Sequence, residues 1–530
     1  MKKLLSVLLM LSLLLTAAAG VAEEKSAVDF GRYDETVKLT YLDMDPNVGK
    51  YDESNPDRAS AKQNVWNDAI LEYLNIDIDR IVAEDWDAIA VLASTMMAGG
   101  ELPDAMTCNA ATLRMLAENE TLADMQDVFD SYEQKNFLKM LYETYPDRMS
   151  QGVVNGKWVG FPLDSGFINT SVLWIRQDWL DAVNMTVPTT IDELEAVAKA
   201  FMDAKLGGEN TQGLGFTLEN VSTMQDIAAA YGVVTKAWNE TDNGYVYGQT
   251  MPAMKDVLAK LNEFYAAGII KPDFAVTNVL DEEVANGQVG MFYGPAWYAV
   301  TSIQTCKNND PKANWITVDL PSLTGEPVKQ WTNNTVSIFV CVNANCENPE
   351  AILKIMEMQM YIEYGPSTEA EQARLYLTED GYSTKNMRPV WMLSDPAAHF
   401  NTTYPEVRAW VKGELAYDQC GPYTQNYLKK IEKYQAGDET QWGFYYLFTD
   451  GYTPVVTKFK ADMLVSSYTG PVTETMSLYQ QSIDDALTEA MVKVIMGEDV
   501  SVYEKAVETW YASGGQQITD EVNAYYASQQ

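Results

Sequence analysis

Residues able to perform covalent chemistry are scarce in this chain. His399 is the only histidine among 530 residues, and this weakens serine- and cysteine-nucleophile mechanisms and multi-histidine metal sites, because each of them needs imidazole. The cysteines are odd in number and match no zinc-binding spacing; they are Cys108, Cys306, Cys341, Cys346 and Cys420. Cys341 and Cys346 are close in sequence and could form a disulfide. The alternative is that both are free thiols. The sequence therefore favours binding over catalysis.

Two acidic residues near the start of the chain have the spacing of a cation-binding loop. Asp43 and Asp45 lie in the run DMDPNVGKYDE, directly after a predicted strand. A DxDxN pattern can bind calcium, but the glycine is Gly49, one place late for an EF-hand loop. Calcium binding, contact with another ligand and plain turn chemistry all remain as interpretations. No cofactor or metal is expected elsewhere.

Charge and length restrict the class of protein. The chain has 37 Lys and Arg against 75 Asp and Glu, a formal net charge of −38. Such a field disfavours binding to nucleic acid and to anionic membranes, although it does not by itself make the ligand a cation. A chain of this length exceeds one hydrophobic core and predicts two or three domains.

The first 22 residues have the pattern of a secretory signal peptide. Lys2 and Lys3 precede an apolar stretch at 4–15, and small residues follow at 17–22. The apolar stretch is short for the roughly 20 residues of a membrane span. We therefore expect export to the periplasm or the outer cell surface. No cysteine stands near the cleavage site, so a lipoprotein anchor is not expected.

Strand and helix patterns alternate along the first part of the chain. Strands are predicted at 37–42, at 75–83 and from Leu102, with helices at 64–74 and 88–97 between them. This alternation indicates βαβ units and a mostly parallel sheet. From about residue 421 the pattern becomes mainly helical.

The segment 172–201 predicts a strand, a short helix, a loop and a second helix. Pro188 ends the first helix, and Thr190 with Glu193 has the spacing of a capping box. The residues expected on the buried face of the second helix are Leu194, Val197, Ala198 and Phe201. Within the first half of the segment, Trp174 and Trp179 are predicted to be core residues, and Arg176 an ion-pair partner, with Asp178 as a candidate.

Several short pieces follow one another in a characteristic order. They are LPD at 102–104, GKWVGFP at 156–162, LWIRQDWL with VPTTIDEL at 173–194, GMFYGPAW at 290–297, VNANCENPEA at 342–351, YTGP at 468–471 and WYASGGQQITDEVNAYY at 510–526. Together they are distributed along most of the mature chain, from residue 102 to residue 526. In order and spacing they resemble bacterial extracellular solute-binding proteins of family 1, the carbohydrate-binding subunits of ABC importers, and among these the larger, LipO-like branch.

The resemblance implies an α/β fold of the type II periplasmic-binding-protein kind, with two lobes, a hinge and a ligand cleft between the lobes. It implies capture of an oligosaccharide, delivery to the permease subunits of an ABC importer, a monomeric state and no catalysis. Two features depart from the family. The lipidated cysteine of many members is missing, and Ala296 replaces the first of two adjacent tryptophans, so that only Trp297 remains.

The resemblance also implies a division of the chain. Lobe 1 is expected at 33–162 and again at 336–420, and lobe 2 at 163–335. The helical part at 421–530 is expected to pack on lobe 2 and the hinge. The glycine-rich run at 156–166 would form the first crossing, and the apolar strand at 335–342 the return.

A sugar site needs aromatic rings for the C–H faces of the ligand and charged or amide groups for its hydroxyls. In open α/β sheets these groups stand on loops at the carboxyl ends of strands. The candidates at such places are Asp43, Asp45, Asn109, Phe161, Asp164, Glu219, Asn220, Tyr293, Trp297, Trp331, Trp391 and Trp442. Core packing is the alternative for the aromatic residues, and turn or cap chemistry for the polar ones.

Two other functions stay open at this point. The same fold could bind a peptide or another small solute. A secreted glycoside hydrolase would need two carboxylates facing each other across a cleft, and no local motif in the sequence pairs them.

Overall fold

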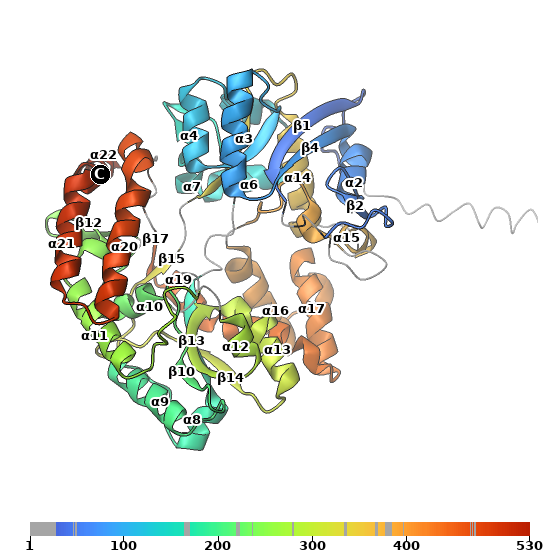
Figure 1. Cartoon of the computed structure of the whole chain (residues 1–530). Helices are drawn as coiled ribbons and strands as arrows, with labels where there is room; N and C mark the ends of the chain where they lie inside the picture. The colour runs from blue at the N-terminus through green and yellow to red at the C-terminus, as the bar shows by residue number, and fades with distance from the viewer. Residues whose placement is uncertain are drawn as a thin grey trace, which may run out of the picture.

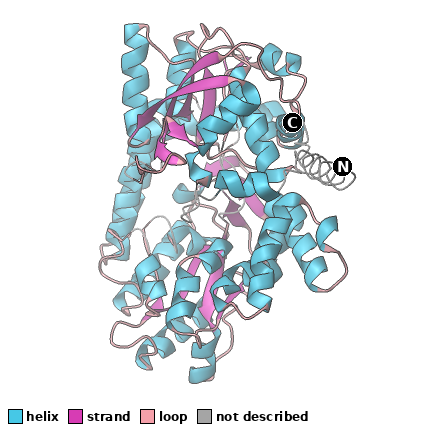
Figure 2. Ribbon diagram, turned by 90° about the vertical axis from the view of Figure 1, so that its right-hand side faces the viewer, coloured by secondary structure: helices cyan, strands magenta, loops and turns pink. Residues whose placement is uncertain are grey.

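A computed structural model of the chain describes residues 28–529, apart from 46, 48–49, 164–169, 219–222, 236, 278–279, 333–335, 366–368, 377–383, 396, 467, 469 and 471–472. Two lobes, each with a central sheet, are joined by chain crossings (Figure 1). Helices surround the strands of both lobes (Figure 2). In the described residues no helix has the length and apolar character needed to span a membrane. The predicted two-lobe α/β fold is confirmed.

Lobe 1 is built on a five-stranded sheet. In spatial order its strands are β4 (Ile76–Ala83), β1 (Val37–Met44), β5 (Ala105–Asn109), β16 (Ile338–Val342) and β8 (Phe161–Pro162). β1 runs parallel to β4 and β5, whereas β16 is antiparallel to both β5 and β8. The return strand therefore fills the gap between two strands that precede it by more than 170 residues.

Two helices of lobe 1, α2 (Val65–Leu74) and α3 (Trp86–Gly99), lie close to the positions predicted at 64–74 and 88–97. The other main helices are α4 (Ala110–Glu118), α6 (Asn136–Thr144) and α14 (Ala351–Tyr364). Asn64 caps α2 by accepting from the backbone N–H of Trp66 at 3.0 Å, and Asp85 caps α3 through Ala88 at 2.7 Å. Such caps satisfy N–H groups that have no partner inside the helix.

Lobe 2 has a four-stranded sheet. Its order is β10 (Gln212–Leu214), β13 (Val289–Pro295), β9 (Ser171–Arg176) and β14 (Trp315–Val318), with β9 antiparallel to β13 and β14. Trp174 and Trp179 are buried, and Arg176 pairs with Asp178 at 2.5 Å. The predictions for these residues are confirmed.

The helix α9 (Ile191–Asp203) has the capping box that its sequence predicts. Thr190 Oγ1 accepts from the Glu193 backbone N–H at 3.2 Å, and the Glu193 carboxylate accepts from the Thr190 N–H at 3.2 Å. Hydrogen bonds from Thr189 and Thr190 hold the pKa of Glu193 below its usual value.

We expect Thr190→Ala to lower the free energy of unfolding by about 1 kcal/mol, since one N–H of the first turn loses its acceptor. Urea unfolding followed by circular dichroism measures this loss. Thr190→Ser keeps the hydroxyl and is the matched control. Equal stability of the two variants would contradict the cap's contribution.

The C-terminal part packs against lobe 2 in two groups of helices. Its helices are α16 (Tyr404–Val411), α17 (Pro422–Gln435), α18 (Trp442–Tyr446), α19 (Thr453–Lys460), α20 (Gln481–Ile495), α21 (Ser501–Trp510) and α22 (Gln516–Gln529). Trp174 of β9 shares a core with Val407, Leu428 and Phe448, whereas its neighbour Ile175 shares a core with Leu487, Trp510 and Val522. Alternate residues of a strand point to opposite faces. Residues of α16–α19 therefore share the core on one face of the sheet, whereas α9 contacts β10 and β13 on the other face, and α20 packs on α11 (Met254–Ala266) beside it.

The boundary predicted at residue 420 is corrected by this packing. Phe400 and Tyr404 already belong to the lobe 2 core, whereas Leu393 still belongs to the lobe 1 core. The chain therefore returns to lobe 2 before residue 400, because the apolar side chains from there on pack against β9 and β13. All five cysteines are free, so Cys341 and Cys346 are not paired. Cys341 Sγ instead lies 3.7 Å from Cys108 Sγ on β5.

Candidate ligand site between the lobes

The strand ends of both sheets face the region where the chain crosses. In lobe 1, β1, β5 and β8 end on one edge, because β8 and β5 are both antiparallel to β16. In lobe 2, β10, β13 and β14 end at the edge where β9 begins. The chain leaves lobe 1 after β8 and enters lobe 2 at β9, so the two edges are joined. Carboxyl ends of strands are where open α/β sheets bind ligands.

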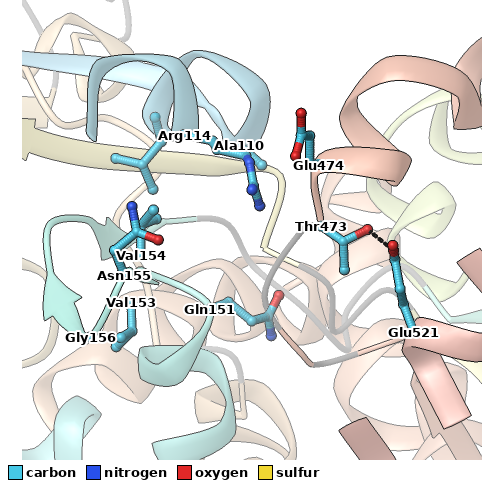
Figure 3. Close-up of a pocket in the computed structure, with 11 residues that line it drawn as sticks. Ala110, Arg114, Gln151, Val153, Val154, Asn155, Gly156, Thr473, Glu474 and Glu521 are labelled. Carbon is cyan, nitrogen blue, oxygen red and sulfur yellow. Dashed lines mark hydrogen bonds between the residues drawn. The ribbon is translucent and has the colours of Figure 1, made fainter. Parts of the chain in front are cut away.

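A cavity of about 480 Å³ lies between lobe 1 and the C-terminal helices. One wall is formed by α4 and by the hairpin of β6 (Val153–Val154) and β7 (Lys157–Trp158), and the other by residues before α20 and by α22. In Figure 3, Arg114 and Asn155 lie on the first side, and Thr473, Glu474 and Glu521 on the second. The helices α20–α22 stand beside lobe 2 and reach toward lobe 1 (Figure 1).

The hairpin that forms part of the lobe 1 wall is held by a tight turn. Its two tip residues, Asn155 and Gly156, have φ values of 51° and 78°. Positive φ at both positions is the geometry of a type I′ turn, for which Asn-Gly is the preferred dipeptide. The hairpin therefore presents the Asn155 amide from a defined backbone.

Polar groups of opposite charge meet at this cavity. Glu521 accepts hydrogen bonds from Thr473, from Thr475 at 2.6 Å and from Gln517 at 3.1 Å. Burial raises the pKa of Glu521, but these hydrogen bonds and the charge of Arg114 outweigh it and hold the pKa below its usual value. Arg114 itself pairs with Glu118 at 2.8 Å. Carboxylate, guanidinium, amide and hydroxyl groups of this kind bind ligand hydroxyls.

Asp43 and Asp45 form a buried network with Arg80 of the neighbouring strand. Arg80 Nη2 lies 2.6 Å from Asp43 Oδ2 and 3.3 Å from Asp45 Oδ2, and Arg80 Nη1 donates to the Met387 carbonyl at 2.9 Å. Burial raises the pKa of Asp43 to about 7, against the lowering effect of Arg80. The two carboxylates thus hold the end of β1 through an internal cation, a role that the sequence did not predict.

Three of the predicted aromatic residues lie in the cores. Tyr293 is fully buried, and Phe161 is 4% exposed. Trp442 is 8% exposed, stacks on Tyr446 at 4.8 Å between ring centroids and has Lys307 Nζ 4.6 Å from its ring. All three therefore have the surroundings of core residues, Phe161 in the lobe 1 core and Tyr293 and Trp442 in the cores of lobe 2.

The other three predicted aromatic residues are half-buried at the inter-lobe edges. Trp297 follows β13 and stacks on Tyr298 at 4.7 Å. Trp331 is in β15 (Gln330–Thr332), on the return crossing, and its indole N–H is buried without a hydrogen-bond partner among the described residues. Trp391 donates its indole N–H to the Met44 carbonyl at the end of β1, at 3.2 Å.

The predicted polar residues divide in the same way. Asn109 accepts from the Thr112 backbone N–H at 2.9 Å and so caps α4, the helix that carries Arg114. It positions the cavity wall and does not line the cavity. Asp164, Glu219 and Asn220 lie outside the described residues.

The only histidine is a structural residue where the chain passes from lobe 1 to the lobe 2 core. His399 Nε2 lies 3.0 Å from Tyr423 Oη, and Tyr423 of α17 packs against Tyr364 of α14 with 4.7 Å between the ring centroids. Burial lowers the pKa of His399 to about 4. The imidazole is therefore neutral at physiological pH and takes part in an aromatic contact between the lobes.

Several cavity residues were not found by sequence reasoning. They are Arg114, Gln151, Asn155, Thr473, Glu474 and Glu521. The Asn155–Gly156 dipeptide is the one local signal among them, since it predicts a hairpin turn. The others come together from four separate segments and have no common motif.

Comparison with known proteins gives concordant results. Residues 71–360 match the family model described as bacterial extracellular solute-binding protein. The polygalacturonan/rhamnogalacturonan-binding protein YtcQ of Bacillus subtilis is 22% identical over 481 residues, which are 86% of this chain and 89% of that protein. Lipoprotein LipO of the same organism is 23% identical over 461 residues, 82% of this chain and 83% of that protein.

Solved structures share the fold at low sequence identity. The substrate-binding protein FusA of S. pneumoniae, an EF-hand mutant in complex with fructo-nystose, has a TM-score of 0.63 at 13% identity, covering 93% of this chain and all of that one. The alginate-binding protein AlgQ2, without calcium ion, has a TM-score of 0.60 at 14% identity, covering 93% and 99%.

Proposed function

Because this chain belongs to the bacterial extracellular solute-binding protein family, we propose that it captures an oligosaccharide between its lobes and hands it to the permease subunits of an ABC importer. In this role it is an exported protein that binds its ligand without chemical change. The relatives and structural neighbours that are named for saccharide ligands support this class of ligand.

The observation that carries the proposal is the meeting of hydroxyl-binding groups from two separate walls at one cavity. Asn155 comes from lobe 1, and Thr473 and Glu521 come from the C-terminal part. Two half-buried rings stand near other strand ends, Trp297 after β13 on lobe 2 and Trp391 beside the end of β1 on lobe 1, although neither is among the residues that line the cavity. Rings stack on the C–H faces of sugars while polar groups bind the hydroxyls, so one ligand would contact both lobes.

Contacts between one ligand and both cavity walls would favour closure of the two lobes around it. A ligand that binds the closed arrangement more tightly than the open one shifts the population toward the closed form. The crossings would serve as the hinge of such a movement. The closed complex would then be the form that the permease accepts.

The proposal is tested with protein lacking residues 1–22. It is screened by thermal shift against neutral and acidic oligosaccharides of two to six sugars, with tri- to pentapeptides beside them, because a ligand of the native state raises the melting temperature by mass action. A saturable shift with a glycan is the expected result. A shift with peptides alone would overturn the saccharide proposal while keeping a binding function.

We expect Trp297→Ala to weaken glycan binding by about tenfold, since stacked rings at binding sites each contribute roughly 1 kcal/mol or more. Isothermal titration with the glycan found in the screen measures the change. Tyr479→Ala, an aromatic side chain 47% exposed at the start of the α20 region, is the control. Equal affinity of wild type and Trp297→Ala would remove Trp297 from the site.

A further inference from the structure

The charges around the inter-lobe cavity bear on which saccharides it can hold. Glu474 and Glu521 line the cavity from the C-terminal part, and Arg114 is the single cation among the described lining residues. The hydrogen bonds from Thr473, Thr475 and Gln517 keep Glu521 ionised at neutral pH. A fixed negative charge therefore belongs to the wall that a ligand must contact.

Arg114 does not offset these carboxylates for a ligand. Its Nε is bound to Glu118 at 2.8 Å, and its charge also acts on Glu521 across the cavity. The charges at and next to the cavity are therefore one positive guanidinium, from Arg114, and three negative carboxylates, from Glu118, Glu474 and Glu521. A ligand carboxylate that approached Arg114 would compete with two carboxylates that the protein already supplies.

The remaining polar lining is neutral, and part of it is already engaged. Gln151 Oε1 accepts from the Val336 backbone N–H at 2.7 Å, and its Nε2 donates to the Asp147 carbonyl at 3.3 Å. Asn155 offers an amide. The Thr473 hydroxyl, by contrast, already donates to Glu521 and accepts from the Met476 backbone N–H at 3.1 Å, so it keeps one acceptor position. Such groups pair with sugar hydroxyls and offer no counter-charge to an anion.

The field of the whole protein acts in the same direction. The formal net charge is −38, and a potential of one sign over a surface repels ligands of that sign during approach. Local and long-range electrostatics therefore agree.

From these observations we infer that the site takes neutral oligosaccharides and discriminates against chains that carry uronate carboxylates. The inference rests on the proposed saccharide function and adds the charge class of the ligand. It also separates this chain from the relative named for binding polygalacturonan, whose sugar units are acidic.

Matched ligand pairs test the inference. The pairs are xylotetraose with its glucuronate-substituted form, and fully methyl-esterified tetragalacturonate with free tetragalacturonate. A neutral glycan found in the thermal-shift screen is paired with its C6-oxidised derivative. Titration at 20 mM and at 500 mM salt gives the affinity ratio of each pair that binds.

The neutral member is expected to bind at least about tenfold more tightly at low salt, which corresponds to roughly 1.4 kcal/mol. The ratio is expected to shrink at high salt, because ions screen the repulsion. Glu474→Gln and Glu521→Gln should each reduce the ratio severalfold. Glu498→Gln changes the net charge equally at an exposed position that does not line the cavity and should leave the ratio nearly unchanged.

The outcomes separate the inference from the proposed function. Equal or tighter binding of the uronate member overturns the inference while oligosaccharide capture stands. A ratio that Glu498→Gln alters as much as Glu521→Gln overturns the assignment to this cavity. Failure of every glycan in the screen refutes the proposed function, and the inference fails with it.

Discussion

Arg80→Met should destabilise the protein by about 3–5 kcal/mol, the cost of leaving buried charges without their partner. Arg80, Asp43 and Asp45 are all nearly inaccessible to solvent, and the Arg80 guanidinium contacts both carboxylates. Methionine fills a similar volume but carries no charge. Urea unfolding at pH 8, followed by tryptophan fluorescence, measures the loss.

The loss should depend on pH in a direction that the pKa of Asp43 fixes. Burial already raises this pKa to about 7 with Arg80 present, and removal of the cation raises it further. A carboxyl group whose pKa is raised by folding contributes stability below its unfolded pKa of about 4 and loses it as the pH rises through the folded value. The deficit of the variant is therefore smallest near pH 5 and largest near pH 8.

Two further variants show whether the effect of Arg80→Met comes from lost charge pairing. Asp43→Asn in the Arg80→Met background should restore part of the stability, because one uncompensated charge is gone. Lys62→Met removes a cation of the same lobe that pairs with Asp79 at the surface, and it should cost less than about 1 kcal/mol. A deficit independent of pH would show that lost packing, not charge, is the cause.

Trp510→Ala should cost about 3–5 kcal/mol, the usual effect of removing a large buried ring. Trp510 is 1% exposed, lies parallel to Tyr247 at 5.4 Å and donates its indole N–H to Asp484 at 2.7 Å. Hydrogen exchange should show the loss concentrated in α20–α22, since this ring joins α21 to the lobe 2 core. Lobe 1 should exchange as in wild type.

A second variant measures the contribution of the hydrogen bond to Asp484 separately from that of ring packing. Burial raises the pKa of Asp484 to about 6, and the Trp510 N–H lowers it. Trp510→Phe keeps most of the ring but loses the donor, so its deficit should grow as the pH rises from 5 to 8. Thr509→Ala, at an exposed neighbouring position, should stay within about 0.5 kcal/mol of wild type. Uniform loss of protection in both lobes would contradict a local role.

Elements with strong local signals were predictable from the sequence. The capping box at Thr190 and the ion pair of Arg176 depend on residues a few positions apart, and both are present. The run GLGFTL at 213–218 has the pattern of a strand, but β10 covers only Gln212–Leu214, and Leu218 N–H bonds to the Phe274 carbonyl outside the sheet. Pairing with β13 decides where this strand ends, and a sequence pattern does not contain that information.

The site was harder to predict because burial there depends on distant segments. Tyr293 stands at a strand end that follows the pattern of a ligand loop, yet every residue of β13 is buried. The cause is the packing of helices from distant parts of the chain on both faces of the lobe 2 sheet. The walls of the cavity likewise come from residues near 114, 155 and 521, and only the assembled fold shows that they meet.

The position of β16 in lobe 1 sets the order in which the two sheets can be completed. Asn109 of β5 pairs with Ile338 of β16, 229 residues later, whereas the lobe 2 strands all lie between 171 and 318. Closing so long a loop is slow, and contacts between distant residues delay folding. Lobe 1 therefore stays incomplete while the chain emerges, and the lobe 2 sheet has all its strands first. The first sheet waits for residue 342, so the lobe that begins the chain is completed after the strands of the second sheet have been made.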